Sequence, residues 1–110
     1  MSLRLPDLTI SSGQTSSNTF NFTKLYRSIK SIYITSPASF GTGGTITVYT
    51  AASPTGTFVP LQSGGADVTL TASKGIEITV AAWGALKIVA ASDPGTNLVF
   101  EVSGTEEMYG

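Results

Sequence analysis

Hydrophobic and polar residues alternate one by one in short runs along this chain, which is the pattern of β-strands with one buried face. In the clearest run, Ile76, Ile78 and Val80 are separated by Glu77 and Thr79. The other runs also place apolar residues at every second position: Phe20–Phe22, Ile32–Ile34, Ile46–Val48, Val68–Leu70, Leu86–Ala90 and Leu98–Val102. No run follows a helical period. We therefore expect about eight or nine short strands that share one hydrophobic core.

Residues typical of turns separate these runs. The segment Thr45–Leu61 predicts a strand, a tight turn at Ser53-Pro54-Thr55-Gly56 and a return strand. Pro54 restricts φ, and Gly56 can adopt turn conformations that are unfavourable for residues with a side chain. Short strands joined by such turns predict an all-β fold, an antiparallel β-sandwich of jelly-roll type.

The chain has 110 residues, enough for one domain with a single core. We divide it into an extended N-terminal arm (residues 1–8), the β-sandwich domain (residues 9–104) and a C-terminal tail (residues 105–110).

The N-terminal arm is too short and too broken by Pro6 for a helix, and too apolar for a free tail. It carries Leu3, Leu5 and Leu8. Two interpretations stay open, because these leucines can pack against their own domain or dock on a neighbouring chain.

The charge of the chain argues against nucleic acid and membranes as partners. The formal net charge is -1 and only 12% of residues are charged, so no strong field attracts phosphate or anionic lipid. We find no apolar run long enough to cross a membrane, and the first residues lack the apolar stretch of a secretory signal. So low a charge suggests a surface that neighbours partly cover.

Residues that carry catalysis are scarce. The chain contains neither histidine nor cysteine, which removes the usual general base, thiolate nucleophile and transition-metal ligands. Among the seven carboxylates, Glu77 and Glu101 form the one plausible catalytic pair, yet we expect both on an outer sheet face without a cleft. Asp67 and Asp93 stand in separate loops, unlike clustered calcium ligands. We expect no enzyme, cofactor or metal site.

Two further features have a structural and a functional interpretation. The glycine-rich segment Phe40–Gly44 is followed by a strand, whereas phosphate-binding loops are followed by a helix, so we expect a β–β connection. Trp83 stands at a strand entrance and is expected to plug an end of the sandwich. The alternative is an aromatic platform for a sugar.

Several outward or terminal residues are candidates for contact with a partner. Tyr26 and Arg27 lie at a predicted corner, and Tyr109 lies in the tail. If the last three predicted strands are neighbours, Val89 and Val99 form a mixed stripe with charged residues, either an ordinary surface or a subunit contact. The candidate partner contacts are Leu3, Arg4, Leu5, Leu8, Tyr26, Arg27, Val89, Val99 and Tyr109.

Five segments, in this order along the chain, resemble small β-sandwich proteins of tailed-phage virions. They are Leu8–Gln14, Ile32–Pro37, Ala52–Phe58, Val68–Thr71 and Trp83–Ile88. In those proteins a Ser-Pro-Asp-Gly-x-Thr-Phe turn precedes a Gly-x-Arg-Tyr-Leu-Lys strand, and discoidin-like jelly rolls that bind sugars share similar motifs. The likeness covers about residues 8–103. Here Thr55 replaces the turn aspartate and Ala85-Leu86 replaces Arg-Tyr, which weakens the sugar-binding analogy.

The resemblance implies a non-catalytic structural protein on the capsid surface of the virion. Its implied role is that of a capsid decoration or cement protein, which stabilises the head by contacting the major capsid protein and its own copies. A dimer or trimer fits this role. The alternatives are a carbohydrate-binding jelly-roll module and a tail or head-fibre component.

Overall fold

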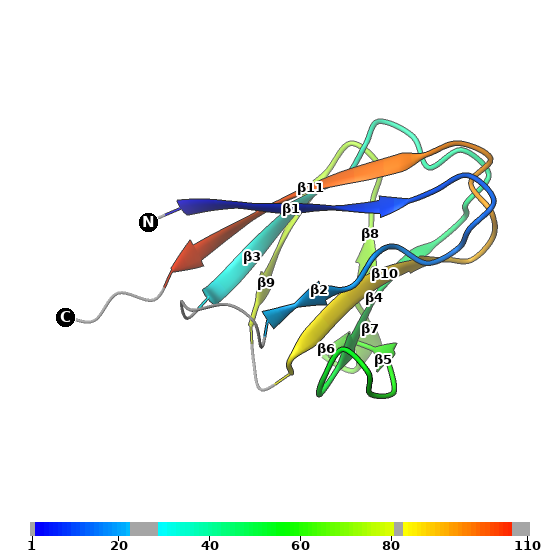
Figure 1. Ribbon diagram of the computed structural model, residues 1–110. Helices are drawn as coiled ribbons and strands as arrows, with labels where there is room; N and C mark the ends of the chain where they lie inside the picture. The colour runs from blue at the N-terminus through cyan, green and yellow to red at the C-terminus, as the bar shows by residue number, and fades with distance from the viewer. Residues whose placement is uncertain (1, 23–28, 81–82, 107–110) are drawn as a thin grey trace.

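The computed structural model describes residues 2–22, 29–80 and 83–106, and its regular structure there consists of eleven β-strands (Figure 1). The strands are β1 (Ser2–Ile10), β2 (Phe20–Asn21), β3 (Ile29–Thr35), β4 (Ile46–Ala51), β5 (Val59–Pro60), β6 (Gln62–Ser63), β7 (Ala66–Asp67), β8 (Thr69–Leu70), β9 (Gly75–Thr79), β10 (Ala85–Ala90) and β11 (Leu98–Glu106).

Two antiparallel sheets pack against each other, as the sequence predicted (Figure 1). The four-stranded sheet has the order β1-β11-β3-β9. The five-stranded sheet has the order β2-β10-β4-β5, with β8 also paired to β4. β6 and β7 form a separate two-stranded hairpin. The molecule is an all-β, sandwich-like domain.

Strand pairing follows a nested order. β1 pairs with β11, β2 with β10, β3 with β9 and β4 with β8, so the first half of the chain pairs with the second half in reverse. The doubling-back point lies just after β4. There Tyr49 stands opposite Pro60 and Thr50 opposite Val59, which confirms the hairpin predicted for Thr45–Leu61.

The core is made of the inward faces of both sheets, and the predicted alternation is confirmed in most of the strands. In β3, Ile32 and Ile34 are buried while Tyr33 is exposed. The most completely buried large side chains are Phe100, Leu8, Ile10, Ile32, Ile34, Ile46, Leu86, Ile88, Val48 and Val102. Removing each from water contributes roughly 1.5–3 kcal/mol, so this set is the main source of stability.

The N-terminal segment is a strand of the four-stranded sheet, which corrects the expected extended arm. β1 pairs with β11 from Ser2 opposite Thr105 to Ile10 opposite Leu98. Leu5 is 7% exposed and Leu8 is fully buried, so both pack against their own domain. Burial in this core removes these two side chains from the surface that a partner can reach.

The condition for a stripe across the last three predicted strands is not met, because these strands are not neighbours. β10 belongs to the five-stranded sheet, and β3 lies between β9 and β11 in the other sheet. Lys87 and Val89 therefore lie on a different surface from Val99. Alternation shows which residues of a strand point inward, but it contains no information about which strands are neighbours.

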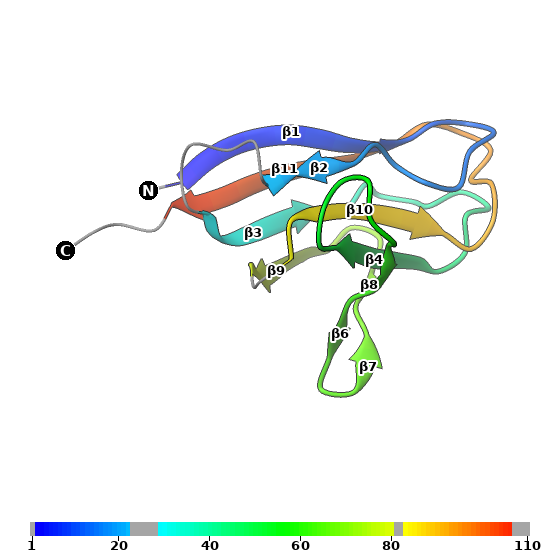
Figure 2. The same cartoon turned by 60° about the horizontal axis from the view of Figure 1, so that its bottom comes forward.

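Two connections complete the fold. The segment Gln62–Asp67 forms the β6–β7 hairpin, which projects from the sandwich (Figure 2). Gly64 and Gly65 have φ of 62° and 85°, as a tight two-residue hairpin turn requires. The glycine-rich segment Phe40–Gly44 joins β3 to β4, so the predicted β–β connection is confirmed.

Candidate functional site

The structure brings only part of the predicted contact set together. Arg4 and Val99 both face outward from the four-stranded sheet, and Val99 is 45% exposed. Val89 is half-buried on the other sheet, where Ser16 forms a β-bridge with it. Tyr26, Arg27 and Tyr109, and the side chain of Leu3, lie outside the described residues.

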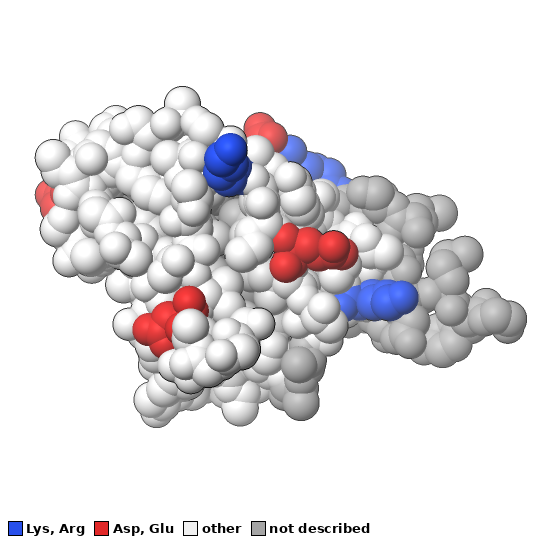
Figure 3. Space-filling view, turned by 180° about the vertical axis from the view of Figure 1, so that it is seen from behind, with Lys and Arg blue, Asp and Glu red and all other residues white. Residues whose placement is uncertain are grey.

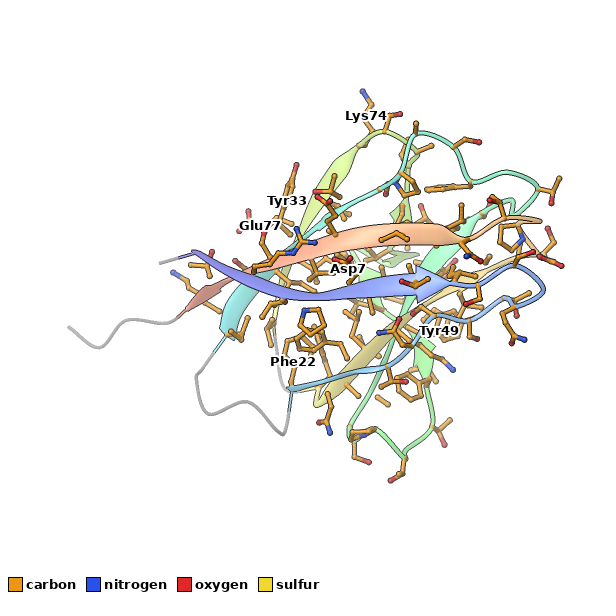
Figure 4. The ribbon with its side chains drawn as sticks, turned by 45° about the horizontal axis from the view of Figure 1, so that its top comes forward. Asp7, Phe22, Tyr33, Tyr49, Lys74 and Glu77 are labelled. Carbon is orange, nitrogen blue, oxygen red and sulfur yellow. The ribbon has the colours of Figure 1, made fainter. Side chains whose placement is uncertain are left out.

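We call the outer surface of the four-stranded sheet the Tyr33 face. Its outward residues are Arg4, Asp7, Thr9, Ser31, Tyr33, Thr35, Glu77, Thr79, Val99, Glu101, Ser103 and Thr105. Figure 4 shows Tyr33 and Glu77 projecting from neighbouring strands on the same side. Tyr33 is 47% exposed. Its ring covers Gly75, and a Cβ added at Gly75 would meet the phenol end of Tyr33, so a larger residue there would displace this exposed ring.

Charges on the Tyr33 face pair with partners on the same face. The Arg4 guanidinium lies 2.6 Å from the Asp7 carboxylate and 3.7 Å from that of Glu101. Ser31 donates its hydroxyl to Glu77 at 3.0 Å. Exposed pairs of this kind add little stability, about 0–1 kcal/mol each. The Tyr33 face carries one arginine, Arg4, against three carboxylates, Asp7, Glu77 and Glu101, so its net charge is negative. The reverse view in Figure 3 shows few charged side chains, with wide uncharged areas between them.

A cleft of about 380 Å³ opens at one edge of the sandwich. One wall is Ile76–Thr79 of β9, the opposite wall consists of Leu61–Ser63 and Val68, and Trp83 also lines it. Successive strand residues point to opposite faces, so four consecutive residues share only the strand's edge. The wall on the β9 side is therefore the free edge of the four-stranded sheet.

Hydrogen bonds fix the direction of the β9 backbone. Val80 donates to the Lys30 carbonyl and Ser36 donates to the Lys74 carbonyl, both at 3.0 Å. In an antiparallel pair, alternate residues exchange hydrogen bonds with the partner strand. The even-numbered residues of this segment therefore face β3. The N–H and C=O groups of Glu77 and Thr79 point away from β3, at the free edge.

Trp83 packs against the hydrophobic core beside Phe22, which bears out the structural interpretation. The two rings meet edge to face, with centroids 5.0 Å apart, and Phe22 points into the interior (Figure 4). The indole Nε1 of Trp83 is enclosed and has no hydrogen-bond partner. Enclosure of the polar end of the ring leaves the cleft an apolar surface at this point.

At the opposite edge of the four-stranded sheet, hydrogen bonds from Asn18 and the irregular backbone of β1 close the second half of that strand. Asn18 accepts a hydrogen bond from the Thr9 N–H at 2.8 Å and donates one to the Asp7 carbonyl at 3.1 Å. Pro6 has no N–H to offer, and the pairing with β11 shifts register between Leu5 and Leu8. These features protect the second half of β1, residues 6–9, from pairing with another strand.

Asp93 fastens the loops at the end of this edge. Its carboxylate accepts hydrogen bonds from Gly95 and Gly13, each at 2.9 Å. These two hydrogen bonds hold the pKa of Asp93 below its ordinary value of 3.8, and the bond from Gly95 has the larger effect. The aspartate thus ties the β1–β2 loop to the β10–β11 loop, a structural role that sequence reasoning missed. The signal was present in Asp93-Pro94-Gly95, since aspartate before such a turn often accepts backbone N–H groups.

Acidic residues do not converge in the described part of the chain. Glu77 and Glu101 lie on the same face, but on strands separated by β3. Within residues 2–22, 29–80 and 83–106, no group of three or more potential metal ligands occurs. Glu77 lines the cleft, which corrects the expectation of an outer face without one. Sequence could not indicate this cleft, because it depends on which strand edges lie opposite each other.

The described segments contain no helix long and apolar enough to cross a membrane. No protein-family model, curated protein or solved structure matches this chain.

Proposed function

We propose that this protein is a non-catalytic structural component of a tailed-phage virion, a capsid decoration protein on the head surface. It would stabilise the head by contacting the major capsid protein and its own copies. The resemblance of five segments to virion proteins motivates this role, and the Tyr33 face is the observation that carries it.

The proposal includes a jelly-roll topology for the sandwich. The nested pairing of β1 with β11, β2 with β10, β3 with β9 and β4 with β8 supports it, since a long antiparallel hairpin rolled into two sheets produces this order. Jelly rolls are common in viral capsid and lectin domains, so this topology fits the proposed role and one alternative.

The Tyr33 face has the properties of a protein interface. It presents Tyr33 and Val99, which are 47% and 45% exposed, beside Arg4. Tyrosine and arginine are enriched at interfaces, and the excess of carboxylates on this face favours a partner surface that carries basic residues. Weak contacts through this face would gain strength when many copies bind one lattice.

Substitution of Val99 by lysine tests this role against a matched control. Val99→Lys places a charge at one end of the Tyr33 face, where Val99 lies opposite Thr9, whereas Val59→Lys places one on β5 of the other sheet, at a valine that is 53% exposed. Binding to capsids lacking the protein is measured by co-sedimentation. We expect Val99→Lys to lower occupancy at least tenfold and Val59→Lys to leave it unchanged. Equal binding by both variants would contradict the proposed face.

A tail or head-fibre component would use the same surface at another place in the particle. Electron cryo-microscopy of the complete virion distinguishes these locations, because copies on the capsid lattice follow its symmetry. Density only at the tail or fibre would replace the decoration role with this alternative.

A carbohydrate-binding module is the second candidate, favoured by a cleft in which Trp83 stands with Gln62 and Ser63. Sugar binding would change the fluorescence of Trp83, the single tryptophan of the chain. Titration with a panel of bacterial surface glycans is the test. An unchanged emission spectrum throughout would eliminate this candidate.

A further inference from the structure

We propose that the cleft beside β9 receives an extended segment of a partner protein, which joins the four-stranded sheet as an additional strand. The segment carries apolar side chains at alternate positions and a basic residue between them. The inference rests on the proposed function only in placing this partner in the same particle.

The backbone of β9 is prepared for such pairing. Its five residues, Gly75–Thr79, pair with β3 in continuous register without a bulge or proline. The outward N–H and C=O groups of Glu77 and Thr79 present the spacing that an antiparallel or parallel strand requires. An edge of this kind is the usual template for strand addition by a peptide.

The position of the cleft fits the side chains of an added strand. A new strand would lie about 4.8 Å beyond β9 in the plane of the sheet. Its inward side chains would point to the same side as Ile76 and Ile78, into the space lined by Leu61, Val68 and Trp83. Leu61, Val68 and Trp83 are apolar, although Gln62 and Ser63 share their wall, so the segment's inward side chains that meet these three are apolar as well.

Charge selects the residues between those positions. Glu77 is the one charged side chain that lines the cleft in the described part of the chain, and it faces outward beside the free edge. A basic residue of the partner directly across from Glu77 would gain a favourable cross-strand pair. A second copy of this chain paired about Glu77 would instead place two carboxylates side by side. Charge complementarity therefore favours a different chain as the occupant.

In the first experiment, a random library of seven-residue peptides is selected for binding to the intact protein. Selection is repeated on Thr79→Pro, which removes an outward N–H while leaving the hydrogen bonds to β3 in place. Thr79→Ala, which keeps the N–H, is the matched control. We expect enriched peptides with alternating apolar residues and at least one Lys or Arg, binding at least tenfold more weakly to Thr79→Pro than to Thr79→Ala.

The second experiment locates the bound peptide by NMR. A selected peptide should shift the amide resonances of Glu77 and Thr79 and slow their hydrogen exchange, and it should change the emission of Trp83. Circular dichroism and thermal melting of Thr79→Pro must match the native protein. If that variant does not fold, Thr79 N-methylation by chemical synthesis replaces it as the blocking change.

Other outcomes overturn the inference. These are the absence of enriched peptides, equal binding to the proline and alanine variants, or amide shifts confined to other strands. Concentration-dependent shifts of Glu77 and Thr79 without peptide would assign the edge to a second copy, and a sugar that moves Trp83 emission would assign the cleft to a glycan. Capsid binding by Val99→Lys is measured separately, so failure here leaves the Tyr33 face untouched.

Discussion

The two edges of the four-stranded sheet differ in whether the outward backbone groups of the edge strand find a hydrogen-bond partner within the domain. At β1, the side chain of Asn18 occupies the outward N–H of Thr9 and the carbonyl of Asp7. At β9, the outward groups of Glu77 and Thr79 lie beside an apolar cleft. Edge strands can pair with other chains, and proteins block those edges that must not pair. The contrast teaches that β1 is closed within the domain from Asp7 to Thr9, while the backbone of β9 is available to a partner along the cleft.

The apolar side chains of the two edge strands differ in how deeply they are buried. Leu8 on β1 is fully buried under the closed edge, whereas Ile76 on β9 is only half-buried and lines the cleft. Both strands thus contribute to the hydrophobic core, since Ile78 of β9 is buried as well, but β9 also leaves Ile76 half-buried at the cleft.

The largest effect is expected for Leu8→Ala, which tests whether β1 belongs to the domain. Truncation of this buried side chain leaves a cavity in the core and should lower the free energy of unfolding by about 2–5 kcal/mol. Urea denaturation measures the loss, with Arg4→Ala as the exposed control on the same strand. A loss below about 1 kcal/mol would return the segment to the role of a loosely attached arm.

A smaller effect is expected for Asn18→Ala, which opens the closed edge without touching the core. Loss of the two hydrogen bonds should destabilise the protein by about 0.5–1.5 kcal/mol and speed hydrogen exchange at Thr9. Exchange at Glu77, on the other edge, should remain as it is. Unchanged exchange at Thr9 would show that Asn18 does not protect this edge.

The smallest effect concerns the pH dependence of the loop that follows β1. Hydrogen bonds from Gly95 and Gly13 lower the pKa of Asp93, so the unfolded chain binds more protons at this group than the folded one does. Its stabilising contribution is complete well above pH 3.8 and is lost as pH falls through the lowered pKa. Urea denaturation at pH 6 and pH 3 should show a smaller decrease for Asp93→Asn than for the native protein. An equal decrease would remove Asp93 from the acid response.

Alternation predicted the faces of most strands, because side chains of period two can be assigned from sequence alone. β1 escaped this rule. Its buried residues change from the odd position of Leu5 to the even positions of Leu8 and Ile10, and the register shift between Leu5 and Leu8 explains the change. This change from odd to even apolar positions on either side of Pro6 could have indicated a β-bulge from the sequence alone.

Strand order and the cleft could not be predicted in this way. β9, β10 and β11 have the same alternating pattern, yet β10 lies in the other sheet. The β6–β7 hairpin had a local signal in Gly64-Gly65, but its position opposite β9 depends on long-range packing. The candidate site therefore lies where local sequence patterns contain least information.

Hydrogen exchange of individual amides in the dilute, isolated protein tests the difference between the two edges most directly. The account predicts that Glu77 and Thr79 exchange quickly while their neighbours Ile76 and Ile78, which face β3, exchange slowly, and that Thr9 is protected by Asn18. Slow exchange at Glu77 and Thr79 in the absence of any partner would show that β9 is already closed, and would contradict the account.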